Sequence, residues 1–344
     1  MFQPNYQVSP QLLRTIKRIA ILVHDLNRLQ LTDLQQAQLL SEARVTSTYA
    51  STSIEGNPLP LTEVRRVLKN RPEQVRQSEQ EVLNYNQVLI QLHEQLNRRP
   101  SKKFTLDLVL QIHSGVTNGL LPAHQIGAWR QEPVVVYDPR NGKIVYLPPD
   151  HQDVARLMAE LVDFVQGQQP ILDPLLLAGI FHKQFVVIHP FVDGNGRTTR
   201  LATSLLLADL GLNFFHLLSF ENYYNKNVTR YFQQVGVFGN YYDLIETLDF
   251  TAWLEYFAEG ILDELLRLEK SLTQVTATPQ SQLQPYHQQL LDYIDLHGFI
   301  TDRDYAKLTE RAKATRSLDF KKLLELGLIQ RQGSGRSTYY QRPK

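Results

Sequence analysis

A stretch of twelve residues, from His189 to Arg200, constrains this chain more than any other segment. It reads His-Pro-Phe-Val-Asp-Gly-Asn-Gly-Arg-Thr-Thr-Arg and combines an imidazole, a carboxylate, two glycines and two arginines. The apolar segments 185–188 and 201–208 flank it, so we expect a loop between two buried helices, with residues 193–196 at the start of the second helix. Backbone N–H groups at such a helix start bind phosphate groups. The stretch therefore predicts an anion site with a base beside it.

The side chains of this stretch fit distinct chemical roles. Arg197 and Arg200 are three residues apart, so they share one helix face, and guanidinium groups match phosphate oxygens. Asp193 offers an oxygen ligand, and Mg²⁺ is usually held by one or two carboxylates together with substrate phosphates and water. His189 can be neutral near pH 7 and accept a proton from a hydroxyl. Taken singly, His189 is as well explained as an ordinary histidine at a helix end, and residues 193–196 as an ordinary turn. Taken together, these residues favour a nucleotide site.

The stretch matches the pattern H-x-F-x-[DE]-G-N-G-R-x-x-R, and by this signature the chain resembles the Fic (Fic/Doc) family. The resemblance implies a mainly α fold, a Fic-type helical bundle with a β-hairpin flap. It implies transfer of AMP from ATP to a Ser, Thr or Tyr hydroxyl of a protein. His189 would deprotonate this hydroxyl, and Phe191 would anchor the loop. The resemblance assigns Mg²⁺ to Asp193, the γ-phosphate to Arg200, and the other phosphates to Gly194, Asn195, Gly196 and Arg197.

The composition is that of an ordinary globular chain. Its 344 residues include 36 Lys and Arg against 35 Asp and Glu, so the overall charge does not select for nucleic acid or anionic membranes. The absence of cysteine excludes disulfides and thiolate chemistry. No apolar run reaches the roughly 18 residues of a membrane helix, and no signal-peptide pattern opens the sequence. We expect a cytoplasmic protein of two or three compact units with no membrane partner.

Residues 45–56 carry a second motif. A helix is expected to end at Glu55-Gly56, because glycine commonly stops helices. A carboxylate there faces the negative end of the helix dipole, which costs about 0.3–1 kcal/mol unless a cation compensates. A solvated glutamate is the plain alternative. However, Ser51-Thr52-Ser53-Ile54-Glu55-Gly56 matches the [ST]-x-x-x-E-[GN] inhibitory motif of many Fic proteins. The resemblance implies that Glu55 pairs with Arg200 and obstructs the γ-phosphate; some relatives also use this glutamate to remove AMP.

Residues 127–149 are the one convincing β segment in the first two-thirds of the chain. Two β-branched runs flank Asp138-Pro139-Arg140-Asn141-Gly142, which predicts a hairpin. A lone hairpin is marginally stable, so it needs a helical body beneath it or a partner's strand beside it. By resemblance it is the flap that aligns the target segment, with Val134, Val135 and Val136 as the pairing edge. A hairpin that only covers the core is the alternative.

An aromatic pair and one histidine outside the motif also need an interpretation. Tyr231-Phe232 occupies the place of an aromatic pair that lies against the adenine in relatives, so the resemblance places Tyr231 in the nucleotide site. The family more often has Tyr-Tyr there. His113 is predicted to be a packed or capping histidine, because no second ligand lies at metal spacing.

The C-terminal part of the sequence indicates a separate unit. Residues 273–282 are uncharged and rich in Thr, Ser and Gln, which predicts a linker. Before it we expect an N-terminal helical region over 1–100 and a Fic catalytic domain over 101–272. After it, residues 283–344 show three helices and two strands, a pattern that resembles a winged helix. Basic residues permit DNA binding by this unit, but their excess is mild, and winged helices also bind proteins. The basic residues are Lys313, Arg316, Lys321 and Lys322 on the third helix and Arg336 at the wing.

Three functions are consistent with these observations. The first is an autoinhibited adenylyltransferase that uses ATP and Mg²⁺ and modifies a target protein or itself. The second is an enzyme of the same fold with another nucleotide donor or with AMP-removing activity. The third is a DNA-binding regulator that senses nucleotide. The sequence names neither the target nor the modified residue, and it leaves a homodimer open.

Overall fold

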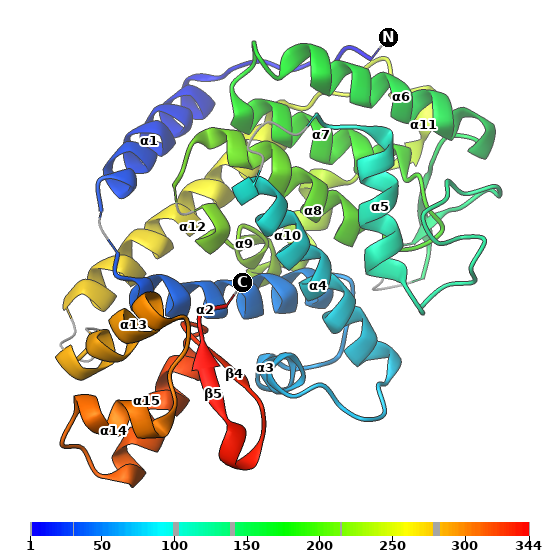
Figure 1. Cartoon of the computed structure of the whole chain (residues 1–344). Coiled ribbons are helices and arrows are strands. Elements are labelled where there is room, and N and C mark those ends of the chain that lie inside the picture. The colour runs from blue at the N-terminus through cyan, green and yellow to red at the C-terminus, as the bar shows by residue number, and fades with distance from the viewer. Residues whose placement is uncertain are drawn as a thin grey trace. The chain divides into compact units, whose positions relative to one another are not determined.

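The computed structural model of the chain describes residues 2–29, 31–98, 103–137, 142–213, 215–277 and 283–343. It is mostly helical, which confirms the predicted mainly α class (Figure 1). The chain divides into two compact units. The first unit comprises residues 1–28 and 43–267, and the second comprises residues 29–42 and 268–344. Among the described residues, none of the helices is long and apolar enough to cross a lipid bilayer.

The part of the chain before residue 278 contains the larger set of helices. They are α1 (Pro10–Asn27), α2 (Asp33–Ile54), α3 (Leu61–Lys69), α4 (Gln77–Arg98), α5 (Leu106–Thr117), α6 (His151–Gln168), α7 (Pro174–Ile188), α8 (Asn195–Leu207), α9 (Glu221–Lys226), α10 (Val228–Val235), α11 (Tyr241–Leu244) and α12 (Thr251–Ala277), with 3₁₀ turns at Ala208–Leu210 and Phe215–Leu217. Several starts follow directly from the sequence. Ser9, Thr105, Asp150 and Asp173 each accept a hydrogen bond from a backbone N–H in the first turn of α1, α5, α6 and α7.

Helix α7 lies at the centre of the first unit. It is buried on nearly every side and packs against α6, α8 and α10, as expected of a helix whose sequence is apolar all round. Helix α8 packs on α7 and also on α4 and α5. The short loop between α7 and α8 is therefore held at both ends by well-packed helices (Figure 1).

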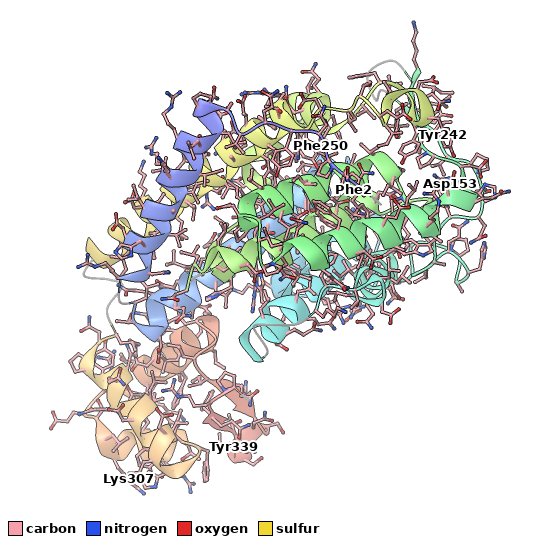
Figure 2. All side chains as sticks on the ribbon, turned by 90° about the horizontal axis from the view of Figure 1, so that it is seen from above. Phe2, Asp153, Tyr242, Phe250, Lys307 and Tyr339 are labelled. Atoms are coloured by element: carbon pink, nitrogen blue, oxygen red, sulfur yellow. The ribbon has the colours of Figure 1, made fainter. Side chains whose placement is uncertain are left out.

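The N-terminal segment and the segment after α11 are both fastened to this helical body. The ring of Phe2 packs edge-on against Phe164 and Phe250, with centroids 5.2 and 6.2 Å away. The Tyr242 hydroxyl accepts a hydrogen bond from the backbone N–H of Asp150 and donates one to Asp153 Oδ2 at 2.6 Å. Figure 2 shows Phe2 close to Phe250, and Tyr242 close to Asp153. The Tyr242 bonds hold the start of α6 near α11.

The predicted hairpin is confirmed, but its sheet contains a third strand. Strand β1 (Val136–Tyr137) pairs antiparallel with β2 (Ile144–Leu147), and β2 also pairs in parallel with β3 (Gly239–Asn240). The turn at residues 138–141 lies outside the described residues. Val134 and Val135 precede β1, so the strand is shorter than the β-branched run suggested. The far segment β3 supplies the support that a lone hairpin lacks.

The start of the predicted linker needs correction. The predicted linker over 273–282 begins inside a helix, since α12 continues to Ala277. Residues 278–282 lie outside the described residues.

The C-terminal part folds in the predicted order of three helices and a hairpin. Its elements are α13 (Pro285–His297), α14 (Asp302–Leu308), α15 (Lys313–Glu325), β4 (Gln330–Gln332), a 3₁₀ turn at Gly335–Ser337 and β5 (Tyr339–Gln341), with β4 and β5 antiparallel. A capping box joins Thr301 to Asp304 at the start of α14. The core of this part is a cluster of buried side chains that includes Leu290, Ile294, Tyr305, Phe320 and Leu323.

Candidate active site

The loop from His189 to Gly194 begins with a backbone conformation that L-residues rarely adopt. His189 ends α7 with φ 51° and ψ 60°, and it is the non-glycine residue with positive φ among those described. Such a conformation costs on the order of 1–3 kcal/mol and persists only where its surroundings hold it. Two contacts hold it here. His189 N donates to Phe185 O at 3.0 Å, and Arg130 Nε donates to His189 O at 2.9 Å.

The middle of the loop is anchored by Phe191 and Asn195. Asn195 Oδ1 accepts from Phe191 N at 2.9 Å, and Asn195 Nδ2 donates to Phe191 O at 2.8 Å. The Phe191 ring is fully buried and stacks on His113 at 3.6 Å and on Trp129 at 5.0 Å between centroids. The anchoring role that the sequence suggested for Phe191 thus has a direct structural basis.

His113 fastens the loop from the side of α5. Its Nδ1 accepts from the backbone N–H of Gly127 at 3.0 Å, so the proton of the neutral ring lies on Nε2, which donates to Asp193 O at 3.0 Å. Burial lowers the pKa of His113 to about 4, so it stays neutral at physiological pH. The prediction of a packed histidine is confirmed.

Two glycines shape the start of α8. Gly194, the N-cap, has φ 79°, and a Cβ there would lie 2.8 Å from Thr117 Cγ2. At Gly196, a Cβ would overlap the Glu55 carboxylate. The first glycine therefore permits the left-handed turn, and the second permits an anionic group to approach the backbone of the helix start. In this structure, that anionic group is Glu55.

The two arginines of the motif are buried beside this helix start. Arg197 is 3% exposed, its NH2 donates to Asp193 Oδ2 at 3.0 Å, and its NH1 lies 3.9 Å from Glu81 Oε2. Nevertheless, Arg197 Nε and NH1 and Arg200 NH1 make no hydrogen bond within the described parts of the chain. Buried donors without acceptors are rare, and a bound phosphate would supply acceptors for them.

Arg200 joins the end of α2 and the turn that follows it to α8. It is fully buried, and its NH2 donates to Glu55 Oε1 at 2.9 Å and to Ser51 O at 2.8 Å, while its Nε donates to Ser51 Oγ at 2.8 Å. Burial opposes the charge, but the Glu55 carboxylate and neighbouring groups outweigh it and raise the pKa of Arg200. Glu55, in the turn after α2, thus has the compensating cation that its position at a helix C-terminus requires.

The His189 side chain is half-buried, and its surroundings favour the neutral imidazole. Burial lowers the pKa of His189 to about 4, and the Val186 carbonyl and the Glu55 carboxylate offset this only in part. Its Nδ1 is buried and meets no acceptor of hydrogen-bond geometry among the described residues. A neutral ring near pH 7 can accept a proton, as a general base must.

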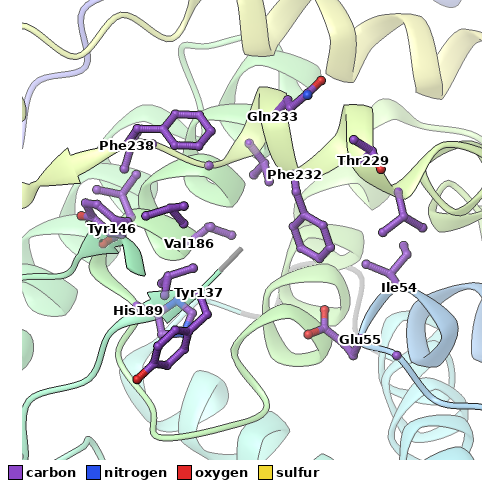
Figure 3. A pocket seen from close by; sticks show the side chains of 18 of the residues that line it. Ile54, Glu55, Tyr137, Tyr146, Val186, His189, Thr229, Phe232, Gln233 and Phe238 are labelled. Atoms are coloured by element: carbon purple, nitrogen blue, oxygen red, sulfur yellow. Dashed lines mark hydrogen bonds between the residues drawn. The ribbon is translucent and has the colours of Figure 1, made fainter. Parts of the chain in front are cut away.

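A cavity of about 550 Å³ adjoins the loop, within the range of small-molecule sites. Figure 3 shows His189 and Glu55 in its wall, with Ile54, Val186 and Phe238 among the apolar side chains around them. Apolar residues from α10, from the segment that follows it and from the flap form most of the remaining wall. A neutral base, a carboxylate and an apolar chamber therefore share one space.

The aromatic pair is divided between this cavity and the core. Phe232 lines the cavity (Figure 3), whereas Tyr231 is 1% exposed and its hydroxyl lies 2.9 Å from His182 Nε2. The described wall of this cavity does not include Tyr231, and its predicted place beside the nucleotide stays a prediction. Neighbouring side chains on a helix point about 100° apart, so only one of the two rings can face the chamber.

Both strands of the flap contribute to the cavity wall. Within the described residues, the wall includes Val136 and Tyr137 of β1 and two residues of β2, but neither Val134 nor Val135. The predicted pairing of this edge with a target segment stays a prediction. All three valines are half-buried, and Tyr137 is 57% exposed.

The predicted metal ligand stands apart from other ligand residues. The side chain of Asp193 is 56% exposed and pairs with Arg197. Among the described residues, no group of three or more His, Cys, Asp or Glu side chains is arranged to hold a metal ion. Any ion at Asp193 would therefore need ligands from a bound substrate.

The basic residues predicted on the third C-terminal helix are in different situations. Arg316 donates two hydrogen bonds to Asp302, at 2.9 and 3.1 Å, and one to Arg311 O. Lys313 and Lys321 are exposed, and Lys322 is half-buried. The side chain of Arg336 lies outside the described part.

Sequence reasoning missed Arg130 and Asn57. Arg130 is 2% exposed and donates hydrogen bonds to the backbone carbonyls of His189 and Pro149. Asn57 follows the inhibitory motif, and its Nδ2 donates to Ser78 O and to Glu81 Oε2. In the sequence, only the positions of these two residues pointed to a role. Arg130 lies near the start of the predicted β segment, and Asn57 directly follows Glu55-Gly56.

The fold and this geometry define a helical domain in which an anion-binding helix start, a neutral histidine and an apolar cavity meet. Residues 103–207 match the model of the Fic/DOC family. This part of the chain is therefore a Fic/DOC domain, as the motif predicted.

Curated relatives and solved structures agree with this assignment. The protein adenylyltransferase Fic of Nematostella vectensis is 30% identical over 182 residues, which cover 52% of this chain and 40% of the relative. The protein adenylyltransferase fic-1 of Caenorhabditis briggsae is 29% identical over 197 residues, covering 55% of this chain and 37% of the relative. This chain thus spans less than half the length of these relatives. A Fic family protein from Desulfovibrio desulfuricans G20 shares the fold, with TM-score 0.68 and 22% identity, over 99% of this chain and 98% of its own.

Proposed function

We propose that this chain is an autoinhibited protein adenylyltransferase. It would transfer AMP from ATP to a Ser, Thr or Tyr hydroxyl of a target protein or of itself. One observation carries the proposal. Glu55 occupies the anion-binding start of α8 and holds Arg200 at 2.9 Å, in the same cavity as a neutral His189.

The unsatisfied donors of the two arginines support a triphosphate at this place. Arg197 Nε and NH1 and Arg200 NH1 are buried without acceptors in the described structure. The helix start adds backbone N–H groups around Gly194 and Gly196. The apolar cavity offers room for the adenine of ATP. Phe232, and not Tyr231, is the ring available there for stacking against it.

The chemistry follows from the order of these groups. The target hydroxyl oxygen attacks the α-phosphorus of ATP, a new P–O bond forms, and the bond to the bridging oxygen of the β-phosphate breaks. Pyrophosphate leaves, and the hydroxyl proton passes to His189. The pKa of His189, lowered to about 4, keeps the ring unprotonated before transfer, and it also makes the ring a weaker base than one with a pKa near 7. Arg130 and Asn195 hold the loop in place during transfer.

Asp193 fits the role of a Mg²⁺ ligand. Its carboxylate is exposed next to Arg197, and a single carboxylate is enough when substrate phosphates and water complete the coordination. Mg²⁺ bound there would neutralise charge on the phosphates. Asp193 would have to release Arg197 NH2, which would then be free to bind a phosphate.

Inhibition would arise from competition at Arg200. The Glu55 carboxylate fills the space against Gly196 and uses the Arg200 guanidinium, so it would both exclude and repel the γ-phosphate. Two alternatives to transfer of AMP from ATP remain. The enzyme would use another nucleotide donor, or Glu55 would support the removal of AMP. Tests with different nucleotides and with an AMP-modified protein distinguish them.

The remaining parts of the proposal concern partners and location. We assign target binding to the flap, through Val136 and the adjoining Val134 and Val135. For the C-terminal unit, DNA or protein binding is a separate prediction that depends on Lys313 and Lys321, because Arg316 is paired with Asp302. A gel shift whose affinity falls steeply with salt would support DNA binding. A cytoplasmic location is consistent with the lack of cysteine, and a homodimer stays open to a mass measurement in solution.

The proposal is tested by label transfer from α-labelled ATP with three proteins: wild type, Glu55→Gly, and Glu55→Gly combined with His189→Ala. We expect weak labelling of wild type, strong labelling of Glu55→Gly, and none of the double variant. Equal labelling of wild type and Glu55→Gly would contradict inhibition by Glu55. Labelling that survives His189→Ala would contradict the mechanism. Parallel reactions with GTP, UTP and CDP-choline identify the donor.

A further inference from the structure

Arg130 is placed to control the geometry of the loop that carries His189. It lies between α5 and the flap, is only 2% exposed, and directs its guanidinium to backbone carbonyls. Its Nε donates to His189 O at 2.9 Å, and its own backbone N–H donates to Pro190 O at 3.0 Å. Both peptide groups that follow the His189 ring are therefore tied to one residue.

The same side chain also reaches both ends of the flap. Arg130 NH1 donates to Glu132 O at 3.2 Å, just before β1, and NH2 donates to Pro149 O at 2.5 Å, just after β2. Arginine suits this task because its planar guanidinium presents five donors in a fixed arrangement, whereas lysine offers a single ammonium group. Loop and flap are thus joined through one buried guanidinium.

The strained backbone of His189 makes this support necessary. His189 adopts a left-handed conformation that L-residues avoid, so it needs contacts that fix the peptide after it. The bond to Phe185 O fixes only the peptide before it. The contact that fixes the following carbonyl is Arg130 Nε.

We propose that Arg130 is a positioning residue that holds the His189 ring in register with the flap, so that the base and the target hydroxyl keep one fixed geometry. This inference rests on the proposed transferase function. Arg130 would touch neither nucleotide nor target. Its loss should therefore lower kcat while the KM for ATP stays the same, because the phosphate-binding groups of α8 do not depend on it.

The experiment compares Arg130→Ala and Arg130→Lys in the Glu55→Gly background, with Arg156→Ala as the matched control. Arg156 is an exposed arginine on α6 that pairs with Asp153 and Glu160. A misplacement of about 1 Å costs roughly 100-fold in rate. We expect kcat to fall by about that factor in Arg130→Ala and by less in Arg130→Lys, with KM for ATP within about twofold and Arg156→Ala unchanged. Dilute guanidinium chloride should restore part of the rate in Arg130→Ala alone.

An unchanged kcat in Arg130→Ala would overturn the inference, as would a change confined to KM. A folded Arg130→Ala protein that guanidinium does not rescue would also overturn it. If Arg130→Ala does not fold, Arg130→Lys decides by the same split between kcat and KM. If the Glu55→Gly parent transfers no nucleotide, the proposed function fails instead. The position of the His189 ring is then followed by NMR, where its resonance must shift in Arg130→Ala and stay in place in Arg156→Ala.

Discussion

At the scale of single residues, the site depends on how His189 is held. Its left-handed backbone turns the chain sharply at the end of α7 and brings the ring into the wall of the cavity. Burial there favours the neutral form of the imidazole. At physiological pH the ring is therefore unprotonated, as the proposed general base must be before it accepts a proton.

This environment predicts the titration of the His189 ring. Its pKa is lowered to about 4, mainly by burial. The ring signal followed by NMR, assigned with His189→Asn, should therefore show no midpoint between about pH 5.5 and 8 and should begin to shift only below that range. A midpoint near 6.5 would mean that the ring is solvated and that its burial is not maintained in solution.

The residues that the motif singled out are brought together, and the sequence could predict this because their spacing is local. Asp193, Gly194, Gly196, Arg197 and Arg200 lie within one loop and the first turns of one helix. The arrangement of Tyr231 and Phe232 could not be predicted in this way. Which of two adjacent rings faces a cavity depends on the rotation of α10 against α7, and this depends on packing between distant segments.

At the scale of elements, the turn after α2 is what keeps Glu55 in place. Asn57 fastens this turn to α4, since its Nδ2 donates to Ser78 O at 2.9 Å and to Glu81 Oε2 at 2.8 Å. Its Oδ1 accepts from Leu59 N at 3.1 Å. The helix C-terminus and the adjoining turn thus act as one unit that presents Glu55 to Arg200.

Loss of this fastening should weaken inhibition in part. Hydrogen bonds to a charged group contribute about 1.5–3 kcal/mol, and a fraction of this would be lost from the inhibited state in Asn57→Ala. We expect basal label transfer to rise by roughly five- to tenfold, and less than in Glu55→Gly. Asn57→Asp, which places a second carboxylate beside Glu81, should behave similarly. Basal transfer at the wild-type rate in both variants would show that the turn holds without Asn57.

In the flap, the hairpin could be predicted from the sequence and its third strand could not. The hairpin could be predicted because two β-branched runs flank a turn sequence, but β3 could not. Gly239-Asn240 has no strand-forming residues, and it pairs with β2 only because packing of α10 and α11 brings it there. Arg130 was missed for a related reason, since its partners His189 and Pro149 lie far along the chain.

At the scale of the whole molecule, several histidines lie in surroundings that favour the neutral ring; His93, His113 and His182 are buried, and His189 is half-buried. Burial lowers the pKa of His93 to about 3 and the pKa values of His113 and His189 to about 4, and it lowers the pKa of His182 well below its ordinary value. Each ring must stay uncharged while the protein is folded. The unfolded chain, where the pKa is about 6.5, binds protons more readily below that pH.

Stability should therefore fall as the solution becomes acidic. A histidine with a lowered pKa stabilises the fold above about pH 6.5, and this contribution is lost as the pH falls toward 4, by up to about 1.4 kcal/mol per pH unit for each ring. Buried Glu221, whose pKa is raised to about 7, acts in the opposite direction but is a single group. We expect a lower melting temperature at pH 5 than at pH 7, measured by calorimetry at constant salt. An equal or higher value at pH 5 would contradict this account.

Mass determination of the intact Glu55→Gly protein after incubation with ATP and Mg²⁺ tests the central claim most directly, with the Glu55→Gly, His189→Ala double variant as control. If Glu55 obstructs a site where His189 activates a hydroxyl, the first protein gains the mass of AMP and fragmentation places it on a Ser, Thr or Tyr. The control gains nothing. No added mass on the first protein or on an added target protein, a gain of phosphate instead of AMP, or the same gain in the control would contradict the account.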